Sequence, residues 1–111
     1  GNIKKWRRLE TENMMKKLDA SELNIFLDQK GETQTSRDLA RCFEKQLLHG
    51  TYRANFFIGG PYGIEKSMLP SGTKFLSLSE MTFTHQMVRL FLLEQIYRAF
   101  TIIRGQPYHN F

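Results

Sequence analysis

Three short apolar runs, separated by longer segments with helical character, most constrain how this chain can fold. The runs cover residues 23–27, 54–58 and 75–78. Turn-forming residues follow them, and the first is expected to end in a turn that contains Asp28 and Gly31. Runs this apolar, alternating with helices, are typical of parallel strands that helices cover on both faces. We therefore predict an α/β fold built on a parallel sheet.

The segments between these runs carry helical signals. Residues 3–18 show a loose helical period with a basic outer face. A second helix is expected to start at Ser36 and to end at Gly50. Thr84 is suited to cap a long, mostly apolar helix that continues to about Arg104.

Length and composition indicate one domain that spans residues 1–111. The chain has 111 residues, of which 41% are hydrophobic, enough for a single core. Charged and polar residues interrupt the longest apolar stretch, residues 87–103, which argues against a membrane span, and no signal peptide is visible. Cys42 is the only cysteine, and no His and Cys set has metal-binding spacing. We expect a cytoplasmic protein with no metal.

The formal net charge is +5, from 16 Lys and Arg against 11 Asp and Glu. A basic surface attracts polyanions, so RNA or DNA is a plausible partner, although many basic helices are simply solvated. Six of the basic residues lie near the start of the chain: Lys4, Lys5, Arg7, Arg8, Lys16 and Lys17.

Two segments at predicted strand ends could form a ligand site. The glycine turn at residues 59–63 would let a ligand approach the main chain, but it also fits an ordinary tight turn. In the elbow that follows the third run, free backbone groups could bind an adenine edge while Leu78, Met81 and Phe83 cover the ring. The alternative is a capped helix start with buried side chains. In parallel sheets, ligands bind at the carboxyl ends of the strands, where both segments lie.

The last helix and the C-terminal tail carry the remaining titratable candidates. His85 and Arg89 share a helix face, and so do Glu94 and Arg98, for which a structural ion pair is favoured. A histidine near a chain end, such as His109, is usually just exposed. No Ser-His-Asp, Cys-His or paired-carboxylate pattern is supported, so hydrolases of these types are not expected.

The joint order of these motifs resembles one known family, the ribosomal RNA large-subunit methyltransferase H family of the SPOUT class of trefoil-knotted methyltransferases. The similarity covers nearly the whole chain, but family members have an opening strand and helix that find no counterpart in this sequence. Asn110-Phe111 also stands where members of this family usually have a basic residue. The segments that carry the resemblance are residues 27–32, 57–63, 76–83, 85–89, 94–100 and 107–109.

The resemblance implies methyl transfer from S-adenosylmethionine to N3 of a pseudouridine in large-subunit ribosomal RNA, by a homodimer that acts on the assembled ribosome. It also implies a trefoil knot near the C-terminus. On this basis Arg89 or Arg98 would stabilise the imide anion, His109 would accept the proton and Tyr108 would orient the base. The implied cofactor-binding residues are Leu27, Gly59, Leu78, Ser79, Glu80, Met81, Thr82 and Phe83.

Two other functions remain open at this point. Without the opening strand and helix, the chain could be a truncated, non-catalytic module for RNA binding or dimerisation. It could also be a small enzyme that uses the glycine turn for another nucleotide.

Overall fold

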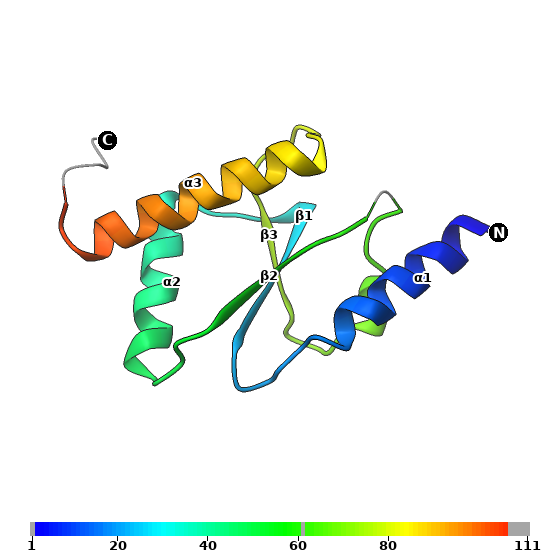
Figure 1. Cartoon of the computed structure of the whole chain (residues 1–111), viewed down its shortest axis with the longest axis horizontal. Helices are drawn as coiled ribbons and strands as arrows, with labels where there is room; N and C mark the ends of the chain where they lie inside the picture. The colour runs from blue at the N-terminus through cyan, green and yellow to red at the C-terminus, as the bar shows by residue number, and fades with distance from the viewer. Residues whose placement is uncertain (1, 61, 107–111) are drawn as a thin grey trace.

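The computed structural model describes residues 2–60 and 62–106, in which helices and strands alternate (Figure 1). The three strands form one parallel sheet with the order β2-β1-β3. The predicted α/β class and parallel sheet are therefore confirmed. In chain order the elements are α1 (Asn2–Met15), β1 (Leu23–Thr33), α2 (Ser36–Leu48), β2 (Ala54–Ile58), the 3₁₀ helix η1 (Lys66–Met68), β3 (Lys74–Ser77) and α3 (His85–Ile103).

Helices lie on both sides of the sheet, with α2 and α3 on one side and α1 on the other (Figure 1). On the α2 and α3 side, alternate residues of β1, Leu23, Ile25 and Leu27, are buried in the main core. Phe43 of α2 and Phe100 of α3 belong to the same cluster, and their rings stack with centroids 5.5 Å apart. The apolar side of each helix therefore covers this face of the sheet.

An aromatic row crosses the opposite face of the sheet. Phe26 of β1 is fully buried and pairs in register with Phe57 of β2 and Phe75 of β3. Its ring centroid lies 4.7 Å from that of Phe57 and 5.8 Å from that of Phe75. The Lys66 ammonium group lies 5.0 Å from the centroid of the Phe75 ring. This row links the three strands across this face of the sheet.

β1 is longer than predicted, because it continues through Asp28 and Gly31 instead of ending in a turn there. Its register with β3 shifts, so that both Leu27 and Glu32 pair with Leu76. Gly31 is needed for close packing: a Cβ atom at this position would lie 2.8 Å from the backbone carbonyl of Phe75. The sequence alone suggested a turn because glycine marks turns and close backbone contacts equally.

Replacing Gly31 with alanine should destabilise the fold. The added methyl group would meet main-chain atoms of β3, which cannot rotate away, so we expect a loss of about 1–3 kcal/mol in the free energy of unfolding. Urea denaturation followed by circular dichroism would measure the loss. The neighbouring exposed change Lys30→Ala is the control, and equal stability of the two variants would contradict the packing role.

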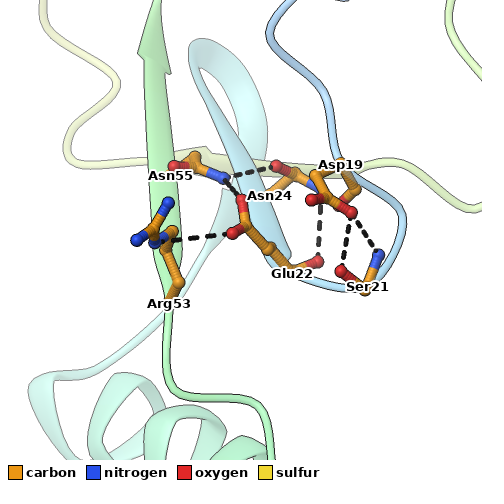
Figure 2. Close-up of polar contacts among 6 residues, drawn as sticks. All are labelled: Asp19, Ser21, Glu22, Asn24, Arg53 and Asn55. Carbon is orange, nitrogen blue, oxygen red and sulfur yellow. Dashed lines mark hydrogen bonds and ion pairs between the residues drawn. The ribbon is translucent and has the colours of Figure 1, made fainter.

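A polar network aligns the starts of β1 and β2 (Figure 2). The Asn55 amide donates hydrogen bonds to the Glu22 carboxylate at 2.8 Å and to the Asn24 side-chain oxygen at 3.0 Å. Arg53 Nε lies 3.5 Å from the second Glu22 oxygen. Side-chain contacts within residues 19–21 close the preceding turn. The network supports the register in which Asn24 lies opposite Asn55.

The helix starts follow local capping chemistry. Thr84 caps α3 as predicted, since its hydroxyl accepts a hydrogen bond from the Met87 backbone at 3.3 Å. α2 is capped by Thr35, which forms a reciprocal capping box with Asp38. Among the described residues, no helix is both long enough and apolar enough to cross a membrane.

Candidate cofactor-binding site

A cavity of about 420 Å³ lies where the carboxyl ends of β2 and β3 and the middle of β1 meet the first turn of α3. Its wall combines apolar side chains with glycine backbone and a few polar groups, including His85. Glu80 is the one predicted cofactor residue that does not line the cavity. The other seven do: Leu27, Gly59, Leu78, Ser79, Met81, Thr82 and Phe83.

The elbow formed by residues 78–83 separates this cavity from a second one. The second cavity also measures about 420 Å³ and extends from the elbow to the start of α2 and the middle of α3. Leu78 and Phe83 line both cavities. Phe83 packs edge-on against Phe91 with ring centroids 4.9 Å apart, which ties the elbow to α3.

Gln29 holds the elbow from the β1 side, a role that no local sequence pattern predicts. Its amide donates a hydrogen bond to the Glu80 backbone oxygen at 2.6 Å, and its side-chain oxygen accepts one from the Thr82 hydroxyl at 3.0 Å. The Ser77 hydroxyl lies 3.0 Å from the Gln29 backbone oxygen and 2.9 Å from that of Ser79. The pairing of β1 with β3 brings these residues together, and that pairing cannot be predicted from the residues next to Gln29 in the sequence.

A charged pair lies at the β1 edge of the cavity. The Asp28 carboxylate is 2.6 Å from the Lys66 ammonium group. Burial alone would raise the pKa of Asp28, but hydrogen bonds from Lys66 and from the Lys30 backbone, together with their charges, outweigh it and hold the pKa below the usual 3.8. The pair fixes the β2–β3 connection to the middle of β1.

The Asp28–Lys66 pair should make stability depend on pH. Because the pKa of Asp28 is lower in the folded state, its contribution is present above the unfolded value near 3.8 and is lost as the pH falls through the folded value. The stability advantage of the wild type over Asp28→Asn should therefore shrink below about pH 4. Denaturant titrations at several pH values would measure this. The trend should weaken in a Lys66→Met background, and an advantage that grows toward acid would contradict the assignment.

α1 contacts the glycine turn from outside the sheet. Arg7 Nε donates a hydrogen bond to the Tyr62 backbone oxygen at 2.7 Å. The hydroxyl of Thr11, the one buried residue of α1, accepts a hydrogen bond from the Glu65 backbone at 2.8 Å and donates to the Arg7 backbone oxygen at 2.8 Å. The basic helix thereby supports one wall of the cavity.

The predicted catalytic residues are not gathered in this cavity. Arg89 lines a separate groove between β2 and α1, which meets the cavity at Ile58. The Arg98 guanidinium forms an ion pair with Glu94, through contacts of 2.5 and 3.0 Å to one carboxylate oxygen. Tyr108 and His109 lie outside the described residues. In the described part of the chain, no cluster of three or more His, Cys, Asp or Glu could hold a metal ion.

A cavity at the carboxyl ends of a parallel sheet, bounded by a glycine turn and a backbone elbow, defines an α/β protein with a nucleotide-type ligand site. A family model described as "Predicted SPOUT methyltransferase" matches residues 1–109. The chain therefore belongs to the SPOUT methyltransferase family.

Curated relatives identify the branch of this family that the chain resembles. The chain is 46% identical over 108 residues to ribosomal RNA large subunit methyltransferase H of Geotalea daltonii, covering 97% of this chain and 71% of that protein. It is also 46% identical over 108 residues to the enzyme of the same name from Halothermothrix orenii, covering 97% and 68%. For that of Geobacter sp. strain M21 the identity is 47% over 104 residues, covering 94% and 68%. The resemblance inferred from the motifs is confirmed.

Proposed function

We propose that this protein methylates N3 of a pseudouridine in large-subunit ribosomal RNA, with S-adenosylmethionine as methyl donor and residues 1–111 acting as one domain. One observation carries the proposal: in a chain of the SPOUT methyltransferase family, seven predicted cofactor residues from separate segments line one cavity. The relatives named as large-subunit methyltransferases support the RNA substrate. Such a protein would act in the cytoplasm, on assembled ribosomes.

The residues of the cavity fit the methyl donor. A volume of about 420 Å³ suits a ligand of this size, and the mixture of apolar walls with few polar groups is typical of cofactor sites. Leu78 and Phe83 would cover the adenine ring, while backbone groups along the elbow would bind its edge. When bound, S-adenosylmethionine supplies an electrophilic methyl group on a positively charged sulfur.

The protein must also remove the N3 proton of the target base, because the neutral imide is a poor nucleophile. His109 would accept this proton and Tyr108 would orient the base. Arg98 is less suited to stabilise the imide anion, because its guanidinium already forms an ion pair with Glu94. Arg89 is exposed and lies in the groove that meets the cavity, so it is better placed to contact the anionic base or a neighbouring phosphate.

RNA would be held on the outer face of α1. Lys4, Lys5 and Arg8 are exposed along this face, while Arg7 and Thr11 point to the glycine turn. Contacts between lysine or arginine and phosphate release counterions, so RNA affinity should fall steeply with salt.

We propose a homodimer that pairs through α3. Met87, Leu90 and Leu93 are exposed on one side of this helix, and Leu93 is 64% exposed. Helical spacing places them on one face, opposite the buried Leu92 and Ala99. An apolar stripe of this kind is more stable when a second copy covers it.

The proposed dimer would also complete the active site. Gln106 donates a backbone hydrogen bond to Thr101, so the chain is still at the last turns of α3 at this point. The cavity lies at Val88, about 20 Å away at 1.5 Å per helical residue. His109 follows Gln106 by three residues, which span about 11 Å at most. We infer that Tyr108 and His109 act in the cavity of the partner subunit.

Calorimetric titration tests the cofactor assignment. S-adenosylmethionine and S-adenosylhomocysteine should both release heat on binding, and ATP, which shares the adenosine but not the sulfur-linked amino acid, should bind far more weakly. Tight ATP binding without binding of the sulfur compounds would favour an enzyme for another nucleotide. No heat from any of the three, with RNA binding retained, would favour a non-catalytic RNA-binding module.

A further inference from the structure

Glu10, on the inner face of α1, is a half-buried residue that the proposed mechanism does not use. Its Oε2 atom is buried and has no hydrogen-bond partner among the described residues. An unpaired carboxylate oxygen is costly to bury, so the surrounding contacts must offset this cost. Its contact with Gly60 indicates its role.

The Glu10 carboxylate occupies the space that a side chain at residue 60 would need. A Cβ atom added to Gly60 would lie 2.5 Å from Glu10 Cδ and 2.6 Å from Oε1. Gly60 does not have positive φ, unlike Gly63 in the same turn, so its backbone conformation does not require glycine. A side chain at residue 60 would therefore have to displace the Glu10 carboxylate from its place against the turn.

Gly60 also lines the cavity, so Glu10 acts on the candidate cofactor site from behind its wall. The hydrogen bonds from Arg7 to Tyr62 and from Glu65 to Thr11 also join α1 to residues 62–65, so Glu10 is a third point of contact between α1 and the chain after β2. We propose that Glu10 is a positioning residue: its carboxylate packs against Gly60 and sets the glycine turn in the shape that forms the cofactor wall. This proposal rests on the proposed function for its ligand, but the packing itself does not.

A double-mutant cycle between positions 10 and 60 tests this proposal. In the wild type, Gly60→Ala should displace the Glu10 carboxylate from the turn and weaken S-adenosylhomocysteine binding about 5-fold. In a Glu10→Ala background the space is vacated, and the same change should cost less than about 3-fold. Glu10→Gln is the matched control, because its amide has the same shape and should leave the cost of Gly60→Ala near its wild-type value.

Thermal unfolding of the same six proteins gives a second readout that needs no ligand. The midpoint should fall with Gly60→Ala when residue 10 is Glu or Gln, and should change little when it is Ala. If Gly60→Ala lowered the affinity and the unfolding midpoint equally in all three backgrounds, the proposal would be overturned. Glycine at residue 60 would then be needed for direct contact with the ligand. If the wild type binds no S-adenosylhomocysteine, the proposed function fails, and the unfolding midpoints still decide the packing of Glu10 on Gly60.

Discussion

Mixing two inactive variants of this protein should restore methyl transfer to about a quarter of the wild-type rate. The first variant, Gly59→Val, blocks the cavity, because a Cβ atom at Gly59 would lie 2.9 Å from the Ile64 side chain in the same wall. The second, Tyr108→Ala with His109→Ala, removes the groups proposed to act on the base. If the tail acts on the partner subunit, a mixed dimer has one intact cavity facing one intact tail.

The expected fraction follows from random assembly. After unfolding and refolding together, about half of the dimers are mixed, and each has one of its two sites complete. Each variant alone is the control and should show almost no activity, while gel filtration should show that both form dimers. Recovery of activity only after co-refolding supports the composite site. No recovery from a preparation in which mixed dimers are demonstrated would place the tail in the cavity of its own subunit.

A single charge on the exposed face of α3 should separate the proposed dimer. Leu93 is 64% exposed in one chain, and in Leu93→Glu an unpaired carboxylate would have to be buried at the subunit interface. We expect a monomer by light scattering and a loss of methyl transfer of about 100-fold or more, because each cavity would then lack the partner's tail that we propose acts in it. Binding of S-adenosylhomocysteine should persist, since Leu93 is not part of the cavity wall.

Leu48→Glu is the matched control for this change. Leu48 is 84% exposed at the end of α2, away from the α3 stripe, so the added charge should leave both the dimer and the activity intact. A Leu93→Glu variant that remains dimeric with full activity would contradict the role of α3 in pairing.

The elements and the outline of the site could be predicted because their signals are local. Thr84 as a helix cap and the apolar run at residues 54–58 were readable from neighbouring residues alone. The strand ends then located the cavity, since parallel strands place their carboxyl ends together.

What could not be predicted depends on contacts between distant segments. The extension of β1 past Gly31 follows from close pairing with β3, and glycine in a sequence does not distinguish that from a turn. Gln29 looked like an ordinary turn residue until the sheet brought it to the elbow. No sequence pattern distinguishes Glu10 from the other charged residues of α1, and only the fold places it against Gly60. The trefoil knot remains a prediction from the family resemblance.

The most direct test of the proposed activity is transfer of a radiolabelled methyl group from S-adenosylmethionine to ribosomes that lack the modification. We expect label in the large-subunit RNA, recovered as N3-methylpseudouridine after digestion to nucleosides, and none with the Gly59→Val variant. Label at another atom or in another RNA would contradict the proposed substrate. No label from a dimeric protein that binds S-adenosylmethionine would contradict the central claim that this chain is a ribosomal RNA methyltransferase.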